Sequence, residues 1–281
     1  MNNKKLFAFV PFAIFVVLFL LAWTERDVDL KDPWYRAVGI LEEGRKEKDS
    51  DLSAKLIDSS GRMLDNLLEK YPFHARVHFF KGYYFITKKN WDSAIEELKI
   101  TIDKGKGGVV NQVEFQAANM LANAAINRAN EYMKEKKIPN GINLMREILL
   151  HYAPRSANLW NHAAYFHQNI QQLDSAIVYY NNALKIDPNF KHSKNNLVGI
   201  YKMYANYYIN QNNLKIAKQY YEQAVRIMPQ DADLHNNLAN VLLKLGDAKS
   251  AVKHFEQAIK INPNNGSYKG NLAIAKRKII S

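Results

Sequence analysis

The sequence contains no cysteine, and this absence excludes several kinds of site together. Disulfide frameworks, thiolate zinc sites, iron–sulfur clusters and cysteine nucleophiles all require a thiol. Lipid attachment through an N-terminal cysteine is excluded for the same reason. Hydrophobic residues nevertheless make up 47% of the 281 residues, with 12 Gly and 8 Pro. This composition is that of a globular chain, which we expect to fold around a core without cross-links.

Motifs for catalysis and cofactor binding are also lacking. Gly105, Gly107 and Gly108 form neither a phosphate loop nor a dinucleotide fingerprint, because no strand precedes them. His162 and His167 are five residues apart, which takes them off the shared helix face that a metal pair needs. We therefore expect a protein that is not an enzyme and that holds no cofactor and no metal.

One long hydrophobic run is present, over residues 6–23. Eighteen residues of helix span roughly 27 Å, close to the thickness of a bilayer core. Lys4 and Lys5 precede the run and acidic residues follow it. The sequence therefore predicts a cytoplasmic tail (1–5), a transmembrane signal anchor (6–23) and a linker (24–33). In a bacterium, the remainder would lie in the periplasm at the inner membrane.

An internal repeat fills the rest of the chain. Pro188, Pro229 and Pro263 each close an apolar stretch, and Ala217 recurs as Ala251 at the interval that separates Pro229 from Pro263. Each stretch carries an alanine, an aromatic residue four positions later and an alanine three positions after that, all on one helix face. Small residues let paired helices approach closely, and proline stops the second helix. We therefore expect an all-α fold of stacked helical hairpins.

This spacing resembles the tetratricopeptide repeat (TPR) family, with Trp160, Tyr201 and His235 where that family favours tryptophan. The resemblance implies a right-handed solenoid of helical hairpins. The units expected are a divergent hairpin (34–74), a repeat (75–108), an irregular long-helix unit (109–156), a repeat (157–190), a repeat with an extended first helix (191–231), a repeat (232–265) and a capping helix (266–281).

In the TPR family, the first helices of the hairpins line a groove that binds segments of partner proteins. Asparagine both donates and accepts, so it suits a peptide backbone. A solvated helix face is the alternative for the same residues. Lys202, Asn206 and Asn237 also match three of five positions of the family's carboxylate clamp, and Ser267 and Asn271 replace the other two. The groove residues that the resemblance implies are Asn158, Asn161, Tyr165, Lys202, Asn206, Asn210, Asn236, Asn237, Asn240 and Lys244.

The net charge of +12 is unevenly distributed. Residues 24–73 carry −3, whereas residues 157–281 carry +8. Lysine predominates and no arginine–aromatic stacking surface is evident, so nucleic acid is not the expected partner. Contact of the basic C-terminal half with anionic lipid or an acidic protein fits better, with a solvated surface as the alternative.

Together these features predict a membrane-anchored, extracytoplasmic scaffold that binds a protein partner in its groove. The layout is similar to that of accessory subunits of envelope secretion, chaperone or assembly complexes. A mitochondrial-import-like receptor with cytosolic repeats is one alternative, although the acidic flank after the span disfavours it. A regulatory subunit of an envelope biosynthetic or cytochrome-assembly enzyme is another.

Overall fold

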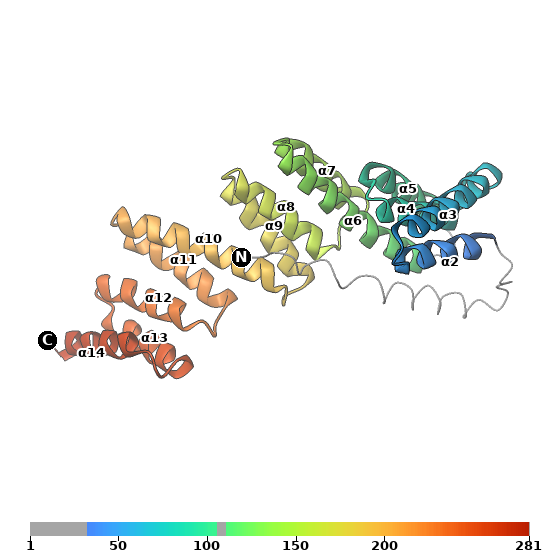
Figure 1. Cartoon of the computed structure of the whole chain (residues 1–281). Helices are drawn as coiled ribbons and strands as arrows, with labels where there is room; N and C mark the ends of the chain where they lie inside the picture. Colours follow the sequence, from blue (N-terminus) through green and yellow to red (C-terminus); the bar gives the residue numbers. More distant parts are fainter. Residues whose placement is uncertain (1–32, 106–110, 281) are drawn as a thin grey trace. The chain divides into compact units, whose positions relative to one another are not determined.

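The computed structural model describes residues 33–105 and 111–280, which form thirteen helices and no strand (Figure 1). The predicted all-α, repeat-based fold is confirmed for this part of the chain. The helices are α2 (Pro33–Lys46), α3 (Ser50–Lys70), α4 (Ala75–Thr87), α5 (Trp91–Gly105), α6 (Asn111–Lys134), α7 (Ile138–His151), α8 (Ala157–Asn169), α9 (Leu173–Ile186), α10 (Lys191–Asn210), α11 (Leu214–Ile227), α12 (Ala232–Lys244), α13 (Ala248–Ile261) and α14 (Gly266–Ile280).

The chain divides into two compact units within α6, one ending at Ala124 and the other beginning at Ala125. In the first unit, α2 packs on α3 and α4 on α5. In the second, each helix from α7 to α14 packs on the next one along the chain. This sequential packing is what a repeat architecture requires, because each hairpin buries its apolar face on its neighbours.

The hairpins turn through one shared backbone conformation. After the first helix, one residue adopts a left-handed conformation, and the next amide returns to a carbonyl five residues earlier, as Asp247 N does to Leu242 O at 3.0 Å. This arrangement satisfies carbonyls that the end of a helix leaves unpaired. Only one of the five equivalent turn residues is the glycine that such a conformation favours. They are Lys89, Lys136, Gln171, Asn212 and Gly246, with φ values of 56°, 61°, 60°, 55° and 85°.

The core of the second unit follows the alanine and aromatic pattern of the sequence. Tyr180, Tyr221 and Phe255 are 0%, 3% and 0% exposed. Each lies between two fully buried alanines of its own helix, so the ring fills the space that the small residues leave between neighbouring helices. These alanines are Ala176, Ala183, Ala217, Ala224, Ala251 and Ala258.

The predicted location as a single-pass inner-membrane protein is corrected by the structure. Within residues 33–105 and 111–280, no helix is both long and apolar enough to cross a membrane. The hydrophobic run at 6–23, on which the prediction rested, lies outside the described residues, as do the tail at 1–5 and nearly all of the linker.

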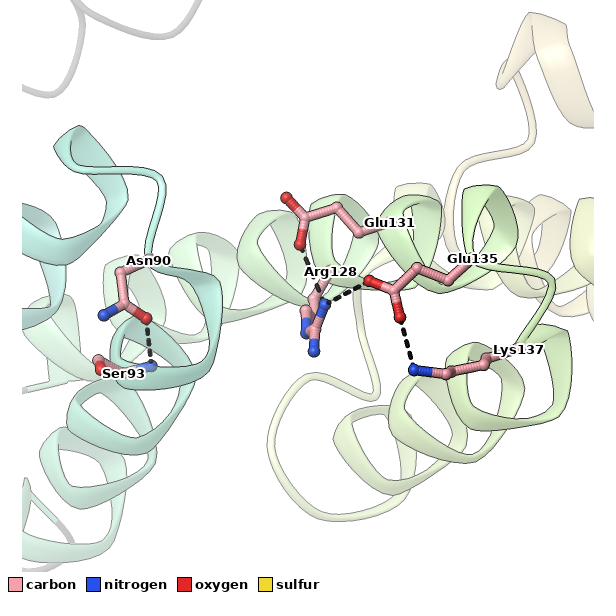
Figure 2. A network of polar contacts seen from close by, with 6 residues as sticks. All are labelled: Asn90, Ser93, Arg128, Glu131, Glu135 and Lys137. Atoms are coloured by element: carbon pink, nitrogen blue, oxygen red, sulfur yellow. Dashed lines mark hydrogen bonds and ion pairs between the residues drawn. The ribbon is translucent and has the colours of Figure 1, made fainter.

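A ladder of charged side chains stabilises the turn between α6 and α7 (Figure 2). Arg128 donates to Glu131 at 3.1 Å and lies 3.5 Å from Glu135, and Lys137 donates to Glu135 at 3.0 Å. Hydrogen bonding from Lys137 holds the pKa of the Glu135 carboxyl below its ordinary value. Pro139 stands in the first turn of α7, where its missing N–H leaves no helix carbonyl unpaired.

Two glycines of the second unit offer a matched test of this packing. A methyl group at Gly141 would lie 2.8 Å from Phe166 Cε1 and 3.3 Å from the backbone of Ala129, whereas nothing lies within 4 Å at Gly199. We expect Gly141→Ala to lower the free energy of unfolding by about 1–3 kcal/mol through overpacking. Gly199 is exposed in the interior of α10, so Gly199→Ala should raise the free energy of unfolding by about 0.5–1 kcal/mol.

Urea denaturation of both full-length variants, followed by circular dichroism, measures these changes. Equal stability of the two variants would contradict the close approach of α6 and α7 at Gly141.

Candidate protein-binding face

The predicted groove residues all lie on three first helices of the second unit, α8, α10 and α12. Equivalent repeat positions hold Asn161, Lys202 and Asn236, and four residues further on Tyr165, Asn206 and Asn240. Positions that recur every repeat, and every fourth residue within a helix, share one side of the stack. We call this surface the first-helix face.

Asn161 is used inside the protein. Its side chain is 8% exposed, and its Oδ1 accepts a hydrogen bond from the buried Ser193 hydroxyl at 3.0 Å. Ser193 lies in the first turn of α10, which has 20 residues where α8 and α12 have 13. The extra turns of α10 therefore cover Asn161 and tie α10 to α8.

Two further asparagines are also engaged within the structure. Asn206 Oδ1 accepts from the Tyr221 hydroxyl at 2.7 Å. Asn236 Oδ1 accepts from Asn271 Nδ2 of α14 at 2.9 Å, and Asn236 Nδ2 lies 3.4 Å from Asn237 Oδ1. These bonds hold the repeats in register and leave each amide only part of its hydrogen-bonding capacity for a partner.

The remaining predicted residues are placed differently. Lys202, Asn210, Asn240 and Lys244 form no hydrogen bond or ion pair with other residues that the structure describes. Tyr165 is 44% exposed. Asn158 is half-buried, and its carbonyl oxygen lies 2.9 Å from His162 Nδ1. The unengaged polar groups of the first-helix face are thus concentrated on α10 and α12.

The structure argues against a functional carboxylate clamp. Of its five positions, Asn206 is bonded to Tyr221 and Asn271 to Asn236. Ser267 is exposed in the first turn of α14 and carries no charge. Lys202 alone supplies a cation among the five, so the second cationic arm of such a clamp is missing.

Sequence reasoning missed two exposed apolar residues that lie beside the first-helix face. Met203 and Tyr207 of α10 are 45% and 56% exposed and lie one turn apart, beside Lys202 and Asn206. Exposed large apolar side chains next to unpaired polar groups are typical of binding surfaces. The signal available in the sequence was the spacing of Met203 and Tyr207, four residues apart in a first helix.

A second missed feature is a contact between a ring of the first helix and a side chain of the second helix, which recurs in four repeats; we call these contacts ring pairs. A ring in the first helix packs on a side chain at one fixed position of the second, as Trp160 does on Tyr179 with centroids 5.2 Å apart. Trp160 Nε1 also donates to Pro154 O at 2.9 Å, six residues earlier. The equivalent pairs are Tyr201 with Tyr220, His235 with His254, and, in the first unit, His78 with Glu97.

In the two pairs that contain histidine, the pKa of one histidine is shifted in each, and the shifts have opposite directions. His78 Nδ1 lies 2.6 Å from Glu97, and this hydrogen bond raises the pKa of His78. His254 Nδ1 lies 3.0 Å from His235 Nδ1. Burial, followed by the charge of His235, lowers the pKa of His254, with a smaller opposing effect from Glu222.

The geometry of this histidine pair adds to the effect of burial on the pKa of His254. His235 Nε2 lies 3.0 Å from Pro229 O and must carry a proton to donate there. The Nδ1 of a neutral His235 is then an acceptor, and His254 Nδ1 donates to it. If both rings were charged, two N–H groups would point at each other. Among the described residues, no three His, Asp or Glu side chains gather closely enough to hold a metal ion.

Tyrosine hydroxyls also bond to carboxylates in this unit. Tyr204 donates to Asp174 at 3.0 Å, and Tyr268 donates to Asp233 at 2.5 Å. Burial raises the pKa of Tyr204 to about 12, with the bond to Asp174 adding to it. The bond to Asp233 raises the pKa of Tyr268 to about 12. Asp233, at one edge of the first-helix face, is thereby tied to α14.

Comparison with known proteins agrees with this architecture. Family profiles described as tetratricopeptide repeat match residues 57–108, 157–190, 198–231 and 232–265, together 154 of the 281 residues. No curated protein sequence matches the chain. A TPR repeats protein from Bacteroides fragilis NCTC 9343 is similar in structure over 73% of this chain and 99% of its own, at 14% identity and a TM-score of 0.54.

Two other solved structures are more distant. MamA protein is 16% identical over 69% of this chain and 94% of its own, with a TM-score of 0.37. The APC/C hetero-tetramer Cut9–Hcn1 is 16% identical over 92% of this chain, with a TM-score of 0.33. This chain spans 45% of the length of that one. At these identities the likeness concerns the fold alone.

The histidine pair predicts a pH-dependent stability. Because the pKa of His254 is lowered in the folded state, the unfolded chain takes up a proton first as the pH falls below about 6.5. His254 therefore lowers the stability of the folded state as the pH falls below about 6.5. His254→Tyr, which installs the residue found at this position in α9 and α11, should reduce that loss.

Thermal unfolding of the full chain at pH 7.5 and pH 5.5 measures the effect. His151→Tyr, at an exposed position at the end of α7, is the matched control and should leave the pH dependence as it is. The same pH dependence in wild type and His254→Tyr would show that the pair does not titrate in this range.

Proposed function

Since this chain is a tetratricopeptide repeat protein, we propose that it is an adaptor that binds a partner protein through the first-helix face of α8, α10 and α12. Proteins of this family generally mediate protein–protein interaction. The role proposed is that of an accessory subunit that holds a segment of another protein within a larger complex, by binding rather than by catalysis.

The observation that carries the proposal is the division among the predicted groove residues. Asn161, Asn206 and Asn236 are bonded internally and fix the stack. Lys202 and Lys244, by contrast, have no partner within the described chain. A rigid scaffold that presents unengaged polar groups loses little conformational freedom when a ligand binds them.

The chemistry of this face favours an extended or helical peptide segment. The amides of Asn210 and Asn240 offer both donors and acceptors to a peptide backbone. Tyr165, Met203 and Tyr207 add exposed apolar area beside them. Rings and thioethers of this kind contribute much of the binding energy in protein interfaces, and the lysines add selection for carboxylates.

We expect Lys202→Glu combined with Asn237→Ala to weaken binding of the partner at least about tenfold, because a cationic donor and an amide are removed from the face. The partner is first identified by in-cell photo-crosslinking from position 240. Its affinity for the wild-type chain and the double variant is then measured with purified proteins, with circular dichroism as the check on folding.

Two control variants make the result specific. Lys185→Glu places the same charge change on α9, a second helix, and should leave the affinity unchanged. Asn161→Ala should lower stability by about 1–3 kcal/mol, because the buried Ser193 hydroxyl loses its acceptor, without lowering the affinity of the folded protein. Undiminished binding by the double variant would place the contact on another surface.

A further inference from the structure

The acidic residues of the C-terminal segment are all engaged within the molecule. Residues 157–281 contain seven of them against fifteen lysines and arginines. Three cap or close turns by accepting backbone amides, two accept tyrosine hydroxyls, and two pair with lysine. In that order they are Asp187, Asp231 and Asp247, then Asp174 and Asp233, then Glu222 and Glu256.

Most of the basic residues have no such engagement. Lys218 pairs with Glu222, Lys276 pairs with Glu256, and Lys185 donates to Asn182. The other basic side chains of this segment form no ion pair or hydrogen bond with residues that the structure describes. The positive charge of residues 157–281 is therefore not neutralised by neighbouring acidic side chains.

Five of these cations are arranged on one surface. Lys249, Lys253 and Lys260 of α13 are exposed and follow one another at intervals of four and seven residues, which places them on one side of the helix. Lys215 and Arg226 of α11 are exposed and occupy the same repeat positions as Lys249 and Lys260, one repeat earlier. We call these five residues the basic stripe.

The carboxylates within the stripe do not cancel its charge. Glu222 and Glu256 hold one further equivalent position, and each already pairs with a lysine outside the stripe, at 3.5 Å and 3.0 Å. Asp247 lies in the field of Lys218 and Lys253, but its oxygen accepts the backbone N–H of Ser250 at the start of α13. The stripe therefore keeps a net positive charge.

The stripe belongs to α11 and α13 and is not a general property of the repeat. In α9 the equivalent positions hold Asp174, Val178, Asn181 and Lys185, which together carry no net charge. A surface that only solvated the repeat would not need to differ between neighbouring hairpins.

We propose that the basic stripe binds an acidic segment of a partner protein, as a second contact surface separate from the first-helix face. No large apolar side chain of α11 or α13 is exposed, so the stripe offers nothing to insert into a lipid layer. It also exposes no aromatic ring on which a nucleobase could stack. Carboxylates are the ligands that remain.

The spacing of the stripe defines the segment that fits. Positions 249, 253 and 260 rise along one side of α13 over about 16 Å. A helix that carries carboxylates at i, i+4 and i+11 presents them at the same intervals on one side. Exposed pairs are individually weak, so several must form together, and salt must weaken the contact.

The test uses the full chain and a fluorescent alanine-based helical peptide with glutamates at i, i+4 and i+11. A peptide of the same composition, with its glutamates distributed around the helix, is the comparison. Fluorescence anisotropy should show that the patterned peptide binds at least about threefold more tightly than the comparison peptide. Its affinity should fall as the salt concentration rises.

Lys249→Glu combined with Lys253→Glu should weaken binding of the patterned peptide about tenfold or more. Lys202→Glu combined with Lys244→Glu makes the same charge change on the first-helix face and should leave it nearly unchanged. Because the first double variant leaves the first-helix face intact, crosslinking from position 240 separates failure of this proposal from failure of the adaptor function.

Three results would overturn the proposal. One is equal binding of the two peptides, and another is an equal effect of the two double variants. The third is tighter binding, through Lys249 and Lys253, to a DNA duplex, to vesicles containing anionic lipid or to a second copy of the chain than to the patterned peptide.

Discussion

The close approach of neighbouring helices at alanine is the constraint on which the second unit depends. Ala176, Ala217 and Ala251 are each fully buried, and a larger side chain at any of them would force paired helices apart. The aromatic residue four positions later then fills the space that remains. Since α9, α11 and α13 obey the same rule, the first helices of their hairpins fall in register, and that register places Lys202 and Asn240 on one face.

Ring pairs add a second layer in which chemistry varies while geometry is kept. The partner of the first-helix ring is Glu97, Tyr179, Tyr220 or His254, and each bonds or stacks at the same place. Packing tolerates this exchange because each side chain can meet a flat ring or a ring nitrogen. The pKa of a histidine in such a pair does depend on its partner, because an imidazole facing a carboxylate gains a proton readily and one facing another imidazole resists it.

The hairpins could be predicted from sequence because alanine, aromatic residue and proline recur at fixed intervals, which are local properties of the chain. The engagement of Asn161 could not be predicted in the same way. Its partner, Ser193, lies 32 residues away in an insertion that breaks the repeat. The ring pairs lie between these cases: the spacing between the two partners is constant, but which side chains hydrogen-bond depends on packing. Asn161, Asn206 and Asn236 bond within the stack, because amides that suit a peptide equally suit a neighbouring repeat.

The basic stripe keeps its positive charge because most of the few acidic residues in 157–281 are engaged in contacts that stabilise the fold. Helix starts need side-chain acceptors, which Asp231 and Asp247 provide, and buried tyrosine hydroxyls need them too. Carboxylates fixed in these roles are held at hairpin ends and between helices, so they cannot offset lysines along the middle of α11 and α13. Glu222 of α11 and Glu256 of α13 each pair with one lysine, so the other cations of that outer surface remain uncompensated. A chain that kept such a surface only for solubility would do as well with its charge on any helix, whereas here α9 is neutral and α13 is strongly basic.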